Sequence, residues 1–127
     1  RQGSFSHSGP ISLDGLTLYM RATEFEEKLG QVTKAKNEQG FEIWSSGSIS
    51  ANIEDGIVVG LIGRSVTMDG AIILQKGDSS EKVLELLGVS GEVEISAPRR
   101  CKLMALLGDR DVQLLMWSDK DWFERTR

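Results

Sequence analysis

An internal repetition constrains this chain more than any other feature of its sequence. Residues 11–18 align with residues 66–73 at a shift of 55, and each segment carries Asp-Gly at the same point. Residues 57–62 align with residues 112–117 at the same shift. A repeated order of signals is typical of two copies of one supersecondary unit. Asp-Gly is also common at turns in unrelated α+β proteins, so chance agreement is the alternative.

Each copy is expected to contain a strand, a short helix and a hairpin. We place repeat one at residues 11–63 and repeat two at residues 66–118. The predicted fold class is α+β: an antiparallel twisted sheet with two short helices on one face, built from two tandem strand-helix-hairpin repeats. Residues 1–10 are predicted to form a flexible N-terminal segment before a single domain, residues 11–127, which ends in the tail 119–127.

Local signals place the two helices and the loop between them. Thr23 and Glu26 have the spacing of a capping box, and so do Asp78 and Glu81. In each copy Leu-Gly follows and predicts the end of the helix. Residues 31–40 are polar and charged and are predicted to form a loop.

Composition excludes several classes of protein. The chain has 127 residues, with 15 Lys and Arg against 19 Asp and Glu, so its formal net charge is −4. An acidic chain lacks the basic face that is typical of nucleic-acid binding, and we predict no nucleic-acid partner. One cysteine and one histidine cannot form a disulfide framework or a zinc cluster, so no metal or cofactor is predicted. No apolar run approaches 18 residues, and no membrane span is predicted.

No constellation of residues predicts catalysis. His7, the only histidine, lies in the segment expected to be flexible. Cys101 follows Arg99 and Arg100, whose charges would lower a thiol pKa, but an unpaired cysteine is more often a buried core residue. The aspartates lie mostly where turns favour them. We therefore predict no catalytic residue and no enzyme activity, with an enzyme that uses carboxylates alone as the catalytic alternative.

The order of these elements resembles a recurrent bacterial module. A short strand, a helix that ends in Leu-Gly and a hairpin with an aromatic residue are similar to the repeat unit of the β-lactamase-inhibitor-protein type. They are also similar to the small outer-membrane assembly lipoproteins. The two repeats together span most of the chain, although it lacks the disulfide-forming cysteines of the inhibitors. The resemblance implies a tandem-repeat protein that grips a partner enzyme on its sheet.

We expect a non-enzymatic protein-binding module, a bacterial immunity or inhibitor protein that neutralises a basic toxin or an enzyme. Tryptophan supplies a large share of the binding energy at interfaces, and acidic side chains attract a basic partner. The predicted partner-binding residues are Trp44, Asp55, Asp119, Asp121, Trp122 and Phe123.

A scaffold or envelope-assembly domain of a longer bacterial protein is the alternative function. The chain begins with Arg1 and not with Met, so we expect that an upstream segment was removed or that the chain is a piece of a longer protein. A cytoplasmic and a periplasmic location both agree with the sequence, and the oligomeric state is left open.

Overall fold

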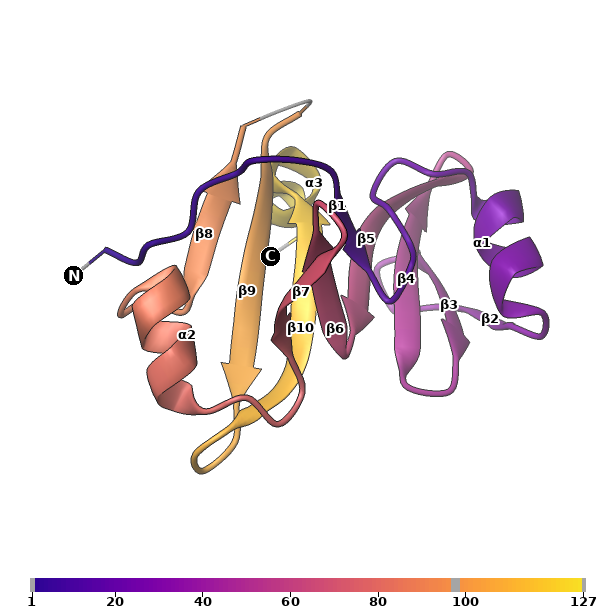
Figure 1. Ribbon diagram of the computed structural model, residues 1–127. Coiled ribbons are helices and arrows are strands. Elements are labelled where there is room, and N and C mark those ends of the chain that lie inside the picture. The colour runs from indigo at the N-terminus through magenta and orange to yellow at the C-terminus, as the bar shows by residue number, and fades with distance from the viewer. Residues whose placement is uncertain (1, 97–98, 127) are drawn as a thin grey trace.

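A computed structural model describes residues 2–96 and 99–126, which form an α+β fold with two antiparallel sheets and three short helices (Figure 1). Arg1, where the chain begins, lies outside the described residues. In chain order the elements are β1 (Ile11–Leu13), α1 (Ala22–Leu29), β2 (Thr33–Lys36), β3 (Glu42–Ser46), β4 (Ile49–Glu54), β5 (Ile57–Gly63), β6 (Ser65–Met68), β7 (Ala71–Gln75), α2 (Ser80–Leu87), β8 (Glu92–Ile95), β9 (Cys101–Leu107), β10 (Val112–Asp119) and α3 (Lys120–Arg125).

Seven strands form the larger sheet, in the order β2-β3-β4-β5-β10-β9-β8, with every neighbouring pair antiparallel. Ala51, Leu61, Trp117 and Leu103 lie opposite one another along one row of this sheet. Each of these four side chains is at most 7% exposed. Because successive side chains of a strand point to opposite faces, this row identifies the core face of the sheet.

The hydrophobic core lies between that face and the smaller sheet, whose strand order is β1-β6-β7. Leu13, Val66 and Leu74 from the smaller sheet are fully buried. Phe25 of α1 and Leu87 of α2 extend the same core, with α1 packed against β5 and α2 against β9. Burial of these apolar side chains is what holds two helices of only about two turns each in place.

The two sheets join at one point of the chain. β5 ends at Gly63 and β6 begins at Ser65, so only Arg64 separates them. The backbone N–H of Arg64 donates to Asp14 Oδ2 at 2.7 Å, and the N–H of Asp14 donates to the Ser65 carbonyl oxygen at 2.8 Å. The turn that follows β1 is therefore bonded directly to the crossing between the sheets.

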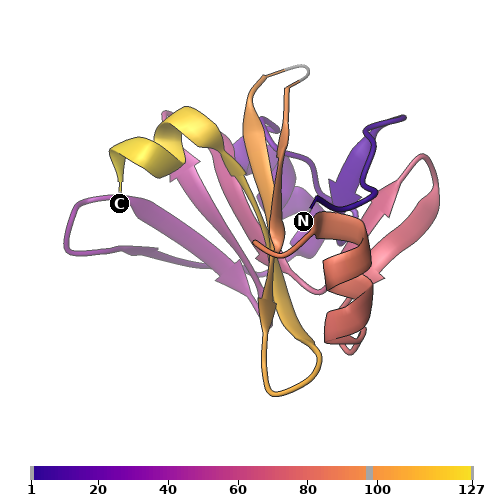
Figure 2. The same cartoon turned by 90° about the vertical axis from the view of Figure 1, so that its left-hand side faces the viewer.

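The third helix, α3, lies on the other side of the larger sheet from α2 and the smaller sheet (Figure 2). Trp122 is 7% exposed, and a Cβ atom on Gly60 of β5 would come within 3.3 Å of its ring. The ring of Phe41 packs edge-on against Trp122, with 6.2 Å between the ring centroids. Arg125 donates two hydrogen bonds to the Glu54 carboxylate, at 3.0 and 3.3 Å, which fix the end of the helix on β4.

The N-terminal segment, which we expected to be flexible, lies against the end of α2. The backbone N–H groups of Ser4 and Phe5 donate to the carbonyl oxygens of Glu85 and Leu86, each at 2.9 Å. Gln2 forms an isolated antiparallel bridge with Gly88. These backbone bonds connect the segment to the folded body before it reaches β1.

The α+β prediction is confirmed, but the prediction of a single sheet is wrong. The crossing at Arg64 carries the chain out of the larger sheet, so the segment with the second Asp-Gly pairs with β1 instead. The arrangement of two helices on one face is also incomplete, since α3 covers part of the opposite face. Residues 33–36 of the expected charged loop form the edge strand β2.

Both predicted helices exist, but their starts differ from the prediction. Arg21 precedes α1 and makes no side-chain capping bond, while Thr23 lies within the first turn. Ser79, and not Asp78, caps α2: its hydroxyl accepts from the Lys82 N–H at 3.2 Å. None of the helices in the described part of the chain is long and apolar enough to cross a membrane.

Candidate functional site

A row of apolar side chains lies on the outer face of the larger sheet. Ile62, Met116 and Met104 face one another across β5, β10 and β9, and all three are partly exposed. Leu114 and Leu106 form the next pair, and Leu106 is 45% exposed. We call these five residues the apolar row. Directly opposed side chains share one face of a sheet, so the five form a continuous patch.

Polar residues border this patch. Ser50 lies beside Ile62 in the register and Glu92 lies beside Met104, so both ends of the cross-strand row are polar. The Lys102 ammonium is 3.0 Å from the Glu92 carboxylate. An apolar centre with a polar border is the usual organisation of a protein–protein interface.

The two edges of the larger sheet are charged. β2 carries Lys34 and Lys36, and β8 carries Glu92 and Glu94. Charged side chains on an edge strand oppose the addition of a further strand. The outer face, and not an edge, is therefore the part of the larger sheet suited to a partner.

Four of the six predicted partner-binding residues meet at the start of α3. Asp119 Oδ1 accepts from the backbone N–H of Trp122 at 2.8 Å and so caps the helix. Phe123 is half-buried, with the Lys102 ammonium 5.1 Å from its ring centroid. Asp121 is exposed in the first turn of the helix. Asp119, Trp122 and Phe123 hold α3 on the sheet face that also carries the apolar row, while Asp121 points away from these contacts into solvent.

The other two predicted residues lie elsewhere. Trp44 is half-buried on the core face of β3, with the Lys34 ammonium 4.3 Å from its ring centroid and its indole N–H bonded to Glu42 at 3.4 Å. Asp55 has a φ of +52° in the turn between β4 and β5, a conformation that aspartate tolerates. The six predicted residues therefore do not form one surface.

The apolar row was not among the residues predicted from the sequence. β9 and β10 carry apolar side chains on both faces over residues 103–106 and 114–117. An antiparallel strand with one solvated face normally alternates apolar and polar residues, and the lack of alternation is the signal that points to this surface.

Apart from the apolar row, the structure has a group of polar side chains around the carboxylate of Asp119, a residue that is 4% exposed. Its Oδ2 accepts from the Tyr19 hydroxyl at 2.7 Å and lies 3.6 Å from the Arg99 guanidinium. The Arg99 guanidinium carbon is 4.6 Å from the Tyr19 ring centroid. Burial, followed by the hydrogen bond to Asp119, raises the pKa of the Tyr19 hydroxyl above its usual value.

This raised pKa predicts a loss of stability at alkaline pH. The unfolded chain releases the tyrosine proton near pH 10, whereas the folded chain retains it. The contribution of Tyr19 to the free energy of unfolding is therefore complete below pH 10. It is lost as the pH rises through the pKa that Tyr19 has in the folded chain, by less than about 1.4 kcal/mol per pH unit. Since Tyr19 is the only tyrosine, phenolate absorbance measures it directly. Asp119→Ala should lower the pH at which half of the Tyr19 side chains are ionised. An unchanged pH of half-ionisation would contradict the role given to the hydrogen bond with Asp119.

Cys101 is a buried thiol, as the favoured interpretation of the sequence expected. It is 2% exposed and accepts a hydrogen bond from the Trp117 indole N–H at 3.2 Å. Burial raises the pKa of the thiol. We expect iodoacetamide to alkylate the folded chain at least about tenfold more slowly than the unfolded chain in urea, because the reacting species is the thiolate. Equal rates, measured by mass spectrometry at one pH, would show that the thiol is accessible.

Within residues 2–96 and 99–126, no group of three His, Cys, Asp or Glu side chains lies close enough together to hold a metal ion. Comparisons with protein-family models, with curated proteins and with solved structures found no match for the chain. The chemistry of its own surface is therefore the guide to its function.

Proposed function

We propose that this chain is a non-enzymatic protein-binding module that holds its partner on the apolar row. The observation that carries the proposal is the continuity of five partly exposed apolar side chains on a face that α3 covers only in part. Contiguous apolar patches on soluble proteins commonly mark sites of interaction.

The composition of the patch suits a protein surface. Met104 and Met116 lie at its centre, and unbranched methionine side chains adjust to an irregular partner. The exposed carboxylate of Asp121 on α3 offers an acidic contact on the same side of the sheet. Such a charge favours a basic partner and increases the rate of encounter.

We further propose that the partner is an enzyme or toxin that this chain neutralises, and that its two halves arose by duplication. In support, the strands follow one another in the same way from the centre of the sheet outwards. The first half has the order β5, β4, β3 and the second half has the order β10, β9, β8. One helix precedes each set of strands, α1 in the first half and α2 in the second. A rigid central sheet would present the row to an enzyme without a loss of backbone conformational entropy on binding.

The test is the binding of a partner captured from the native source and then purified. Met116→Glu should weaken the complex at least about tenfold, because a buried unpaired carboxylate opposes association with an apolar surface. Val89→Glu is the matched control, since Val89 is a 69% exposed apolar residue between α2 and β8. Titration calorimetry with each variant measures the affinity. Wild-type affinity in Met116→Glu, or an equal loss in both variants, would exclude the apolar row.

A further inference from the structure

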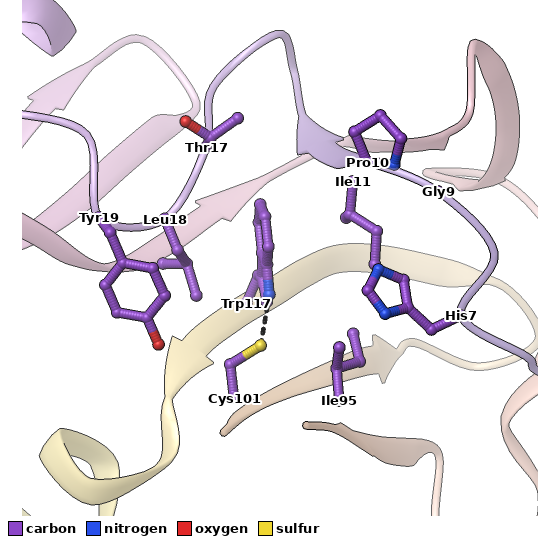
Figure 3. A pocket seen from close by; sticks show the side chains of 10 residues that line it. All are labelled: His7, Gly9, Pro10, Ile11, Thr17, Leu18, Tyr19, Ile95, Cys101 and Trp117. Atoms are coloured by element: carbon purple, nitrogen blue, oxygen red, sulfur yellow. Dashed lines mark hydrogen bonds between the residues drawn. The ribbon is translucent and has the colours of Figure 1, made fainter. Parts of the chain in front are cut away.

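A pocket of about 440 Å³ opens on the core face of the larger sheet, on the opposite side from the apolar row (Figure 3). Trp117, Cys101 and Ile95 line it from the sheet, and Leu18 and Ile11 line it from the segments around β1. Each of these five side chains is at most 7% exposed. The volume falls within the roughly 300–1,000 Å³ that is typical of small-molecule sites.

Two side chains with polar ends, His7 and Tyr19, also line this apolar pocket. His7 approaches from the N-terminal segment and Tyr19 from the opposite side (Figure 3). Arg99 does not line the pocket itself, but its side chain is 62% exposed and its guanidinium carbon lies 4.6 Å from the ring centroid of Tyr19, which does. A guanidinium presents five N–H donors, and the ion pair of Arg99 with Asp119 is long, at 3.6 Å.

The carboxylate of Asp119 takes the only O–H of Tyr19, so the Arg99 guanidinium is the donor left for a ligand on this side of the pocket. Asp119 Oδ1 accepts from the Trp122 N–H, and its Oδ2 accepts from the Tyr19 hydroxyl. Both oxygens are therefore bonded within the protein, while Arg99 extends into solvent. A ligand with an apolar body and an acceptor at one end matches this arrangement, because the body enters the pocket and the acceptor remains at Arg99.

We propose that the pocket binds an amphipathic carboxylate of the medium-chain fatty-acid class, with its chain against Trp117 and its carboxylate at the Arg99 guanidinium. The site goes beyond the proposed function, since a protein on the apolar row would occupy the other face of the sheet. Apolar contact supplies the binding energy, and the ion pair at the rim sets the orientation of the ligand.

The probe is decanoate, followed by two-dimensional NMR of the three tryptophan indole N–H groups of the labelled chain. The Trp117 indole N–H bonds to Cys101 at the pocket lining, so its resonance should shift and saturate. Trp44 lies on β3 and the Trp122 ring packs against Gly60 of β5 under α3, so their resonances should stay in place. Decanol, which has the same chain without the charge, should bind roughly fivefold more weakly.

Two exposed arginines provide matched variants that leave the core intact. Arg99→Gln should weaken decanoate roughly fivefold and leave decanol unchanged. Arg100→Gln should change neither ligand, because Arg100 bonds to Glu94 at 3.0 Å. The absence of a saturable Trp117 shift with decanoate would overturn the proposal. Shifts confined to the methyl groups of Met104 and Met116 would also overturn it, and so would equal effects of the two arginine variants. The Met116→Glu experiment tests the outer face of the sheet, and the decanoate experiment tests the pocket on the core face. Failure of one proposal therefore leaves the other in place.

Discussion

Replacing Asp119 by alanine is expected to lower the free energy of unfolding by about 3 kcal/mol, from the loss of a buried acceptor and of a helix cap. Asp119 is 4% exposed, and its carboxylate joins parts of the chain that are far apart in sequence. Alanine leaves the partly buried Tyr19 hydroxyl without its acceptor at 2.7 Å. It also leaves the Trp122 N–H in the first turn of α3 without a partner. Each loss is worth about 1–2 kcal/mol.

Two substitutions separate these effects. Asp119→Asn keeps one of the two oxygen acceptors and should lose about half as much stability, because the amide oxygen still caps the backbone N–H of Trp122 while the amide NH2 cannot accept from the Tyr19 hydroxyl. Asp121→Ala changes an exposed aspartate two residues away and should stay within about 0.5 kcal/mol of the wild type. Urea unfolding followed by circular dichroism measures all three variants. If Asp121→Ala destabilised the chain as much as Asp119→Ala, the buried contacts would not be the cause.

The hairpins could be predicted from the sequence because their information is local. Asp55-Gly56 stands between two apolar runs, and the structure has both residues at positive φ between β4 and β5. The same holds for Asp69-Gly70 between β6 and β7. At such a turn a left-handed conformation requires glycine or tolerates aspartate, so residue type and structure are directly connected.

The division into two sheets could not be predicted in the same way. It depends on the crossing at Arg64, where the chain leaves β5 and its neighbours in the larger sheet. The contact that fixes this crossing joins Asp14 to Arg64, 50 residues apart. Neither residue carries a local signal for that pairing. A long-range contact of this kind is set by packing of the whole core, and not by propensity.

The candidate site was predicted only in part, because residue type does not reveal which face of an element a side chain occupies. Trp122 is used to pack α3 on the sheet, and Trp44 lies under Lys34 on the core face. Asp119 is a capping residue and a buried acceptor. The residues of the apolar row lie in strands that are apolar on both faces, so the pattern of β9 and β10 could not separate core from surface.

Substitution of Gly63 by alanine is expected to cost about 3 kcal/mol, at the upper end for overpacking a core. Gly63 is buried at the end of β5, opposite Leu115 of β10. A Cβ atom there would overlap Leu13 Cδ2 and Asp14 Oδ2. Leu13 is fully buried within the core cluster, and Asp14 is held by the bond from the Arg64 N–H. The substitution would therefore push the smaller sheet away from the larger one.

Gly108→Ala is the matched control for this prediction. The atoms nearest to a Cβ on Gly108 belong to the Gln113 side chain, which is exposed and can move at the cost of its surface hydrogen bond to Asp111. We expect a change below about 0.5 kcal/mol, measured by urea unfolding alongside Gly63→Ala. Because Ile11 of β1 lines the pocket, displacement of the smaller sheet in Gly63→Ala should also weaken decanoate binding. A Gly63→Ala variant as stable as Gly108→Ala would mean that the smaller sheet adapts, and that close contact at this crossing is not what couples the two sheets.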